Sequence, residues 1–339
     1  MKGLEFFVLS LVDVTQRKAY PLAVQQTVRS EAEKAAIKER KKQRAKRPKR
    51  TKGKPKGRPK GSRNKDKNEV KLSCELLRIN ALLVTLLQLL RVFVRVKYLA
   101  LDGHFGHQQA VLLAQQNDLQ LISKLRKDAA LYEPYDGAYS GRGPKRKYGA
   151  RLNYEQLPTK YLQQSETQGD VCTQYYQGLF LHPEFGQALN AVIIVKTNVK
   201  TQKVGYVILF SSDAALGWEK LVDYYSLRFQ IEFNFRDAKQ HFGLEDFMNT
   251  TATGVENAVN LSFLLVNVSA KLLADSEEKE VGVLDLKTRF RGCKYAVEAI
   301  KMLLEKPETI LSPEAIAEVK ARISHLGRIH RTKAAAASP

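Results

Sequence analysis

The feature that most constrains this chain is a run of positive charge from Lys38 to Lys65. These 28 residues contain 16 Lys or Arg against one acid, Glu39, so the run holds +15 of the chain's formal +21. Like charges repel, and the prolines and glycines of its second half break regular structure. Residues 32 to 44 have a helical pattern, but the basic linker spanning 31–69 is expected to be disordered. The run therefore separates a short segment before it from a globular body after it.

Within this run, residues 56–61 read Lys-Gly-Arg-Pro-Lys-Gly and resemble an AT-hook. A narrow minor groove concentrates negative potential, and an extended Arg-Pro strand fits into it. Arg58 and Lys60 are therefore predicted to contact DNA. Three interpretations stay open: minor-groove recognition, phosphate contacts without sequence preference, and a linker that takes no part in binding.

The composition favours a cytoplasmic, DNA-associated protein of about two domains. The 339 residues are 44% hydrophobic, which is ample for a buried core. The excess of 56 Lys and Arg over 35 Asp and Glu points to a polyanionic partner, nucleic acid first. The three cysteines, Cys74, Cys172 and Cys293, form no C-x-x-C pair. Disulfide scaffolds and thiolate zinc modules are therefore not expected. Cysteines without such pairing indicate a reducing compartment, so the predicted location is the cytoplasm, in association with the nucleoid.

Neither apolar stretch of the first hundred residues predicts a membrane partner. Residues 6–12 are too short for a signal peptide and lead directly into Asp13. Residues 79–96 contain Asn80, Thr85, Gln88, Arg91 and Arg95, whereas a membrane span needs about 20 nearly uninterrupted apolar residues.

Alternating strand and helix patterns predict an α/β fold around a mixed sheet. The expected elements are a hairpin of strands 6–12 and 19–24, a helix at 72–91, a strand at 93–101, a helix at 108–116 and a strand at 119–125. In such sheets chemistry gathers at the carboxyl ends of strands. Asp102 follows the strand at 93–101 and is a candidate for that position.

Residues 126–213 have a different character and predict a β-rich insertion. Three runs favour strands, at 173–181, 189–195 and 205–210. Tyrosines alternate with glycine-rich and basic stretches such as 141–147, a pattern that suits nucleic acid because phosphate pairing and base stacking cooperate. Ordinary solvated hairpins have the same pattern, so both interpretations stay open.

A long helix predicted from Trp218 to about Gly243 carries the most informative residues. At about 100° per residue, Tyr225, Arg228, Glu232 and Lys239 fall on one narrow arc bordered by apolar side chains. Burying an unpaired charge costs several kcal/mol, so such a row needs partners or a function. The residues alone support two explanations of this row equally. Arg228 and Glu232 form an internal ion pair at i, i+4, or Glu232 is a functional carboxylate.

The spacing Tyr225-x2-Arg228-x3-Glu232-x6-Lys239 is similar to the YREK signature of insertion-sequence-four family transposases, which are bacterial DDE recombinases. Asp102-Gly103-x-Phe105 resembles the second-aspartate motif of that family. The tyrosine-rich region between Asp102 and Glu232 resembles the β insertion that precedes its catalytic helix. The resemblance spans residues 1–275.

This resemblance implies an RNase H-like mixed sheet with flanking helices and two-metal chemistry on DNA. Three carboxylates would hold two divalent ions about 4 Å apart, and hard oxygen ligands suit magnesium or manganese. Asp102 and Glu232 would be catalytic residues and metal ligands. Tyr225, Arg228 and Lys239 would hold the DNA backbone. Self-association in a synaptic complex is also implied.

The first of the three carboxylates is the point at which the sequence departs from the family. An RNase H-like core has three strands before its first helix, with an aspartate on strand one, whereas two strands precede the helix at 72. Either the first carboxylate is missing from a truncated transposase, or Asp13 supplies it. His104 and His107 flank Asp102, but an H-x-x-H pair without a third partner is a weak metal signal, so both are interpreted as supporting or surface groups.

The predicted organisation has five parts. Residues 1–30 and 70–125 form the first part of the catalytic core, 31–69 the basic linker, 126–213 the β-rich insertion, 214–275 the core helices with the YREK motif, and 276–339 a helical C-terminal region. The predicted function is DNA transposition by two-metal phosphodiester hydrolysis and strand transfer at transposon ends, abolished if the first carboxylate is missing. The alternative is a noncatalytic, basic DNA-binding fragment.

Overall fold

The computed structural model describes residues 4–46, 71–139, 141, 143–246, 248, 251–276, 281–303, 312–314, 316–317 and 321. The chain forms two compact units, Met1–Gln230 and Ile231–Pro339. Helix α1 (Glu31–Lys46) matches the helical pattern at 32–44, so the expected disorder of the linker is wrong for its first part, where Glu33 pairs with Arg78. Most of the basic run, including Arg58 and Lys60, lies outside the described residues.

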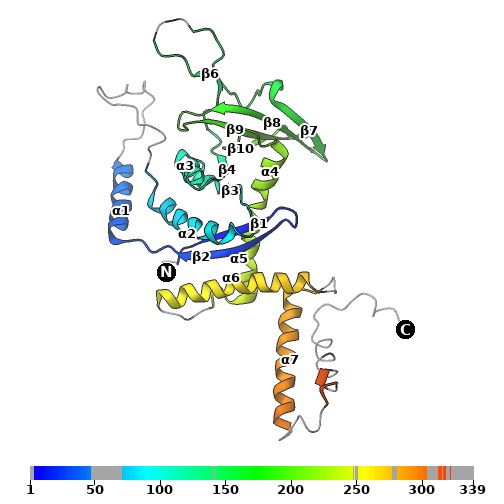
Figure 1. Cartoon of the computed structure of the whole chain (residues 1–339). Coiled ribbons are helices and arrows are strands. Elements are labelled where there is room, and N and C mark those ends of the chain that lie inside the picture. The colour runs from blue at the N-terminus through cyan, green and yellow to red at the C-terminus, as the bar shows by residue number, and fades with distance from the viewer. Residues whose placement is uncertain are drawn as a thin grey trace. The chain divides into compact units, whose positions relative to one another are not determined.

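The first unit is built on an eight-stranded mixed sheet (Figure 1). Its order is β3-β4-β10-β9-β8-β5-β6, and β7 pairs with β8. Strands β3 and β4 are parallel, and the other pairs are antiparallel. The strands are β3 (Tyr98–Ala100), β4 (Gln120–Leu125), β5 (Tyr132–Pro134), β6 (Tyr148–Arg151), β7 (Leu162–Gln168), β8 (Val171–Leu181), β9 (Ala188–Asn198) and β10 (Val204–Ser211). Each of the three strand runs predicted between 173 and 210 is therefore confirmed.

Buried residues alternate between the two faces of this sheet, as the twofold period of a strand requires. On β9, Ala191 and Ile193 belong to one core, and Val192 between them belongs to another. Strand β4 divides in the same way, with Leu121 in the first core and Ile122 in the second. The sheet is therefore covered on both faces, which confirms the predicted α/β class with flanking helices.

Helices α2 (Cys74–Leu90) and α3 (Gln108–Gln116) cover the first face. Helix α2 begins at Ser73, whose hydroxyl accepts a hydrogen bond from the Leu76 amide at 3.3 Å, a standard N-cap. Leu76, Ile79 and Leu83 then recur at helical spacing and are buried. Helix α4 (Trp218–Leu227) covers the second face, where Leu221 packs with Ile122, Val192 and Leu209.

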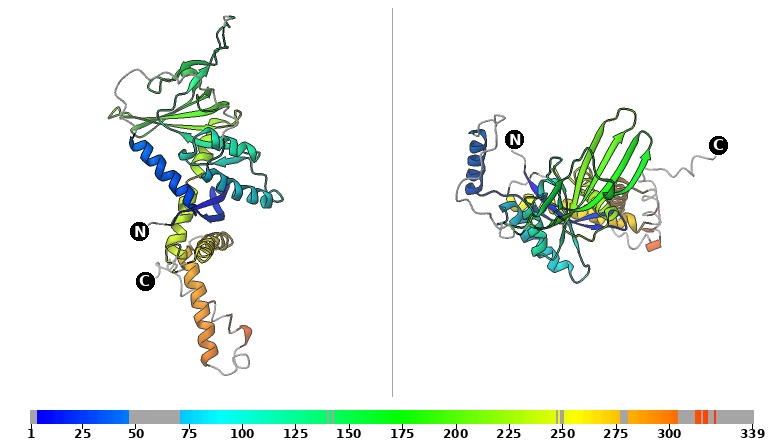
Figure 2. Two further views of the ribbon diagram at one scale, coloured as in Figure 1. Left: turned by 90° about the vertical axis from the view of Figure 1, so that its left-hand side faces the viewer. Right: turned by 90° about the horizontal axis from the view of Figure 1, so that it is seen from above.

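The β-rich region predicted at 126–213 continues the same sheet as β3 and β4. Strand β10 pairs with β4, so that Phe210 lies opposite Ser123. Figure 2 shows β7, β8 and β9 as green arrows lying side by side. Residues far apart in the sequence are thereby placed on neighbouring strands.

The predicted hairpin forms but does not join this sheet. Strands β1 (Phe6–Asp13) and β2 (Lys18–Gln26) pair with each other as a separate two-stranded sheet. Side-chain contacts hold the hairpin against the rest of the first unit. Phe7 and Leu9 pack against the first core, and Arg17 at the hairpin turn forms an ion pair with Asp223 of α4 at 2.6 Å. Phe6–Leu9 and residues of α1 and α2 line a cavity of about 780 Å³ that also reaches Leu101 and Phe105.

Strand β3 is shorter than the strand predicted at 93–101. After α2, the amides of Phe93 and Val94 both donate to the carbonyl of Leu90, which turns the chain instead of extending it. The side chains of Val92 and Phe93 remain exposed. Strand pairing with β4 begins only at Tyr98.

The second unit is helical and consists of α5 (Gln230–Phe242), α6 (Ala252–Ala274) and α7 (Val283–Leu303). The rings of Phe235 and Phe263 pack edge to face, 5.0 Å between centroids. The Ser262 hydroxyl donates to the Phe242 carbonyl at 2.9 Å, and the Lys287 ammonium donates to the His241 carbonyl at 2.5 Å. These contacts tie the three helices together.

By length and composition, α6 is also able to cross a membrane. Its 23 residues have a mean hydropathy of 1.3 in the most apolar window. Core helices of soluble proteins pass the same test, and one face of α6 packs inward through Val259, Phe263 and Val266. This helix alone is weak evidence for a membrane span.

Candidate functional site

Asp102 lies at the carboxyl end of β3, where the sequence predicted it. It begins the short 3-10 helix η1 (Gly103–Phe105), but its side chain makes no capping hydrogen bond and is 59% exposed. Its backbone carbonyl accepts a hydrogen bond from the Ser123 hydroxyl on β4 at 3.0 Å. The carboxylate is therefore held at the sheet edge by its backbone and stays open to another partner.

Gly106 allows this turn to pack closely on β4. A Cβ atom at this position would lie 2.3 Å from the Lys124 carbonyl oxygen, closer than real Cβ contacts permit. Gly103 has more room, because the nearest atoms are 3.5 Å from the corresponding position. Of the two glycines that follow Asp102, only Gly106 is thus required for steric reasons.

Helix α4 brings Arg228 and Tyr225 to Asp102. The helix starts beside the end of β10 and runs for ten residues, about 15 Å at 1.5 Å per residue. Tyr224 of this helix packs against Tyr98 of β3, with 5.5 Å between ring centroids. Directly after the helix, Arg228 Nη2 lies 3.5 Å from Asp102 Oδ1.

The environment of Arg228 leaves part of its hydrogen-bonding capacity unused. Its side chain is 25% exposed, and its guanidinium lies 5.7 Å from the centroid of the Tyr225 ring. Its Nε is buried and has no hydrogen-bond partner among the described residues. The guanidinium of Arg228 is therefore a partly buried cation whose exposed edge suits a phosphate oxygen, while its Nε is closed to solvent.

Tyr225 is held in its neutral form by the same surroundings. Burial is the main cause that raises the pKa of its hydroxyl, and the Asp102 carboxylate raises it further, while Arg228 acts in the opposite direction. A neutral hydroxyl is able to donate a hydrogen bond to an anion.

The single helix predicted from 218 to 243 is wrong, because it breaks at Arg228 and Phe229. The amides of these two residues bond to Tyr225 and Ser226, three residues back, which tightens the turn and interrupts the regular ladder between α4 and α5. The predicted arc of four polar residues is therefore divided after Arg228. Arg228 pairs with Asp102 instead of Glu232, so the internal i, i+4 ladder is also absent from the described contacts.

Glu232 and Lys239 belong to α5 and to the second unit. Glu232 is exposed in the first turn of α5. The Lys239 ammonium pairs with Glu245 at 2.5 Å. Asp102 and Glu232 thus lie in different units, and their sharing of a cation stays a prediction.

The described residues do not make a complete metal centre. Asp102 has the hard oxygen donors that magnesium and manganese prefer. However, no group of three or more His, Cys, Asp and Glu side chains that could hold a metal ion occurs in the part of the chain that the structure describes. The charged partner found for Asp102 is a cation, Arg228. Within the first unit Asp102 is therefore the one predicted ligand that the structure places at this end of β3, and Glu232, in the second unit, stays a predicted ligand.

Asp13 and His104 have local polar partners, whereas the buried Nδ1 of His107 has none among the described residues. Asp13 Oδ1 accepts hydrogen bonds from the amides of Thr15 and Gln16 at 2.8 and 3.0 Å, so it stabilises the β1–β2 turn. His104 is largely exposed and lies 3.6 Å from Glu75. Burial lowers the pKa of His107, and His104 lowers it further.

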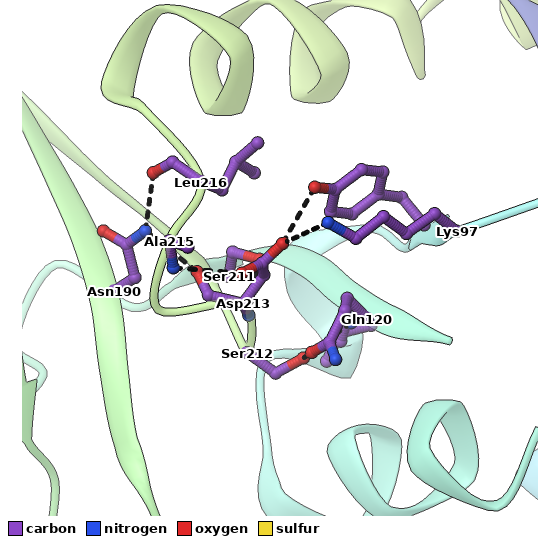
Figure 3. A network of polar contacts seen from close by, with 10 residues as sticks. Lys97, Gln120, Asn190, Ser211, Ser212, Asp213, Ala215 and Leu216 are labelled. Carbon is purple, nitrogen blue, oxygen red and sulfur yellow. Dashed lines mark hydrogen bonds and ion pairs between the residues drawn. The ribbon is translucent and has the colours of Figure 1, made fainter. Parts of the chain in front are cut away.

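A polar network around Asp213 was not predicted (Figure 3). Asp213 follows β10, and its carboxylate accepts hydrogen bonds from the Tyr98 hydroxyl at 2.9 Å and the Ala215 amide at 3.0 Å. Lys97 Nζ lies 3.0 Å from the same carboxylate. The available signal was the polar Ser-Ser-Asp sequence at the end of a buried strand, but because β10 runs antiparallel to β4, Asp213 lies beside the start of β3 and not beside Asp102 at its carboxyl end.

Comparison with known families agrees with this fold. A family model described as DDE superfamily endonuclease matches residues 1–177, just over half of the chain. The chain therefore belongs to the DDE superfamily of endonucleases, and its mixed sheet flanked by helices is consistent with the RNase H-like nuclease fold. The match includes Asp102 and ends within β8, before α4. No curated protein matches the chain.

Proposed function

We propose that this chain acts on DNA in transposition as a transposase of the insertion-sequence-four type. The observation that carries the proposal is the placement of Arg228 and Tyr225 beside Asp102, at the carboxyl end of β3 in a DDE superfamily domain. The formal charge of +21 supports a polyanionic substrate, and endonucleases of this superfamily act on DNA.

In this proposal the chain's own residues bind and orient a backbone phosphate. Arg228 binds a phosphate oxygen through the exposed edge of its guanidinium, and the neutral Tyr225 hydroxyl donates a second hydrogen bond. Lys239, Arg58 and Lys60 add contacts to the DNA backbone. The exposed oxygens of Asp102 face the phosphate that Arg228 holds. The products would be nicked and rejoined strands at transposon ends, made by a protein that is cytoplasmic, nucleoid-associated and self-associating in a synaptic complex.

Asp102 and Glu232 are proposed as the carboxylates that hold divalent metal, magnesium or manganese. DDE superfamily nucleases generally use such ions, which activate a water or hydroxyl nucleophile when bound. Since the described residues contain no group of three such ligands, we assign no first carboxylate.

A noncatalytic DNA-binding role is the second candidate. It is favoured by the ion pair between Asp102 and Arg228, together with the missing three-ligand group in the described part of the chain. Loss of one ligand removes most cleavage from a two-metal site but leaves phosphate contacts in place.

A strand-cleavage assay separates the two candidates. The full chain is incubated with supercoiled plasmid and magnesium or manganese, and nicking is followed on gels beside the Asp102→Asn and Glu232→Gln variants. Nicking that both variants abolish supports the transposase. DNA binding without nicking in any of the three proteins supports the noncatalytic role, and no DNA binding at all overturns both.

A further inference from the structure

A largely buried carboxylate, together with contacts of Ser212 to Gln120 and Leu121, fixes the loop between β10 and α4 to the sheet. The Asp213 side chain is only 12% exposed. Oδ2 accepts from the Tyr98 hydroxyl and faces the Lys97 ammonium, while Oδ1 accepts from the Ala215 amide (Figure 3). Both carboxylate oxygens thus accept hydrogen bonds. In an Asp213→Asn variant, either orientation of the side-chain amide would place its NH2 group against another donor, where no hydrogen bond can form.

The start of α4 is fixed from the opposite side by two amide side chains. Asn190 Nδ2 donates to the carbonyls of Asp213 and Leu216 at 2.9 and 2.7 Å. Gln177 Nε2 also donates to the Leu216 carbonyl, and Gln177 Oε1 accepts from the Trp218 amide, the first residue of α4. The helix therefore begins at a defined position over β8 and β9.

Tyr98 connects this anchor to the phosphate-binding end of α4. Its hydroxyl is bound by Asp213, and its ring packs against Tyr224 with 5.5 Å between centroids. Tyr224 is next to Tyr225, and Arg228 lies one turn further along. Because Tyr98 lies in β3 and Asp102 follows the end of that strand, the contact sets the rotation of α4 against the segment that leads to Asp102.

We propose that Asp213 is a positioning residue for Arg228. Through Tyr98 and the start of α4, it holds the Arg228 guanidinium at the place where a DNA phosphate meets Asp102. This inference rests on the proposed function, since it assigns the phosphate contact to Arg228. It adds a residue that lies outside both sequence motifs, more than a hundred positions after Asp102.

A double-mutant cycle on DNA affinity tests the proposal. Asp213→Asn, Arg228→Gln and the double variant are compared with the unmodified chain by fluorescence anisotropy on a labelled duplex at fixed salt. Asp213→Asn is expected to weaken binding about tenfold when Arg228 is present and to have almost no effect when it is replaced. A purely structural role would weaken binding equally in both backgrounds and would overturn the proposal.

Two further variants keep the result decisive. Tyr98→Phe keeps the ring and removes only the hydroxyl, so its cycle with Arg228→Gln decides the case if Asp213→Asn does not fold. Asp170→Asn is the matched control, because Asp170 is an exposed carboxylate paired with Lys200, and no loss of affinity is expected. Absence of DNA binding by the unmodified chain would overturn the proposed function itself, whereas binding without coupling would overturn only the role of Asp213.

Discussion

Arg228 differs from an ordinary surface arginine because its side chain is only 25% exposed and its buried Nε has no acceptor among the described residues. An exposed ion pair between long side chains contributes little to stability, typically about 0–1 kcal/mol. The single 3.5 Å approach of Arg228 to an exposed Asp102 belongs to that weak class. The residue is held mainly by its helix and by the Tyr225 ring, so a phosphate replaces the Asp102 contact at small cost.

Replacement of Arg228 is expected to weaken DNA binding while leaving the fold intact. Arg228→Gln should lower affinity about tenfold or more, since hydrogen bonds to charged groups contribute about 1.5–3 kcal/mol. Arg228→Lys should recover only part of it, because an ammonium lacks the planar fork of a guanidinium. Anisotropy titrations check both variants. Lys200→Gln, with the same change in charge, is the control, and an equal loss there would show that only total charge matters.

Gly106 is expected to be intolerant of even one methyl group. Gly106→Ala places a Cβ against the Lys124 carbonyl, so the turn after Asp102 must shift, at a cost of about 1–3 kcal/mol of unfolding free energy. Gly103→Ala is the matched control, with ordinary contacts at 3.5 Å and a small expected effect. Urea unfolding of both variants gives the comparison, and equal stability would contradict the steric explanation.

At the scale of elements, the sequence predicted which helices and strands form better than it predicted where they begin and end. Helices α2 and α3, the β1–β2 hairpin and strands β8 to β10 were all predicted, because their apolar periodicity reflects burial. The break after α4 was not predictable, since neither proline nor glycine marks it and its cause is a local change in hydrogen bonding at Arg228 and Phe229.

The candidate site was predicted only as single residues. Asp102 was found because it follows a strand, and Arg228 because of motif spacing. Their contact depends on how α4 lies across the sheet, which no local pattern encodes. Asp213 was missed because its partners Lys97 and Tyr98 are more than a hundred residues away in sequence.

The N-cap of α2 provides a test of element stability. Ser73→Ala removes the acceptor for the Leu76 amide and is expected to lower the free energy of unfolding by about 1 kcal/mol. Chemical denaturation measures the change. Ser73→Asp, which restores an acceptor, should recover the loss, and failure to recover it would assign the effect to something other than capping.

The basic run is expected to supply much of the salt dependence of DNA binding. Replacing the ten Lys and Arg residues between 47 and 65 with Gln removes their counterion release, so the slope of log affinity against log salt should become less steep. Affinities measured from about 50 to 200 mM salt determine the slope. An unchanged slope would show that the globular units make all of the phosphate contacts.

For the whole molecule, the ionisation of Asp213 makes the free energy of unfolding depend on pH. Burial alone would raise the pKa of this carboxyl, but the Lys97, Ala215 and Tyr98 donors outweigh it and bring the pKa below the ordinary value of 3.8. A carboxyl with a lowered folded-state pKa stabilises the fold above its unfolded pKa, and this contribution is lost as the pH falls through the folded value. The free energy of unfolding should therefore decline below about pH 4.

The Asp213→Asn variant provides the comparison for this acid dependence. Its stability at neutral pH should be lower, and its decline in acid should be shallower, because the titrating group is gone. Urea unfolding from neutral to acid pH checks the difference. Parallel curves for the two proteins would assign the acid sensitivity to other carboxylates, such as Glu133 beside Lys160.

Strand β1 has a consequence for handling the protein. Among the described residues it pairs with β2 alone, so alternate amides and carbonyls along eight mostly aliphatic and aromatic positions point away from any neighbouring strand. At high protein concentration, an open strand edge of this length can pair with strands of other molecules and so promote aggregation. Purification at low concentration, or a lysine introduced into β1, is the practical means of keeping the protein from precipitating.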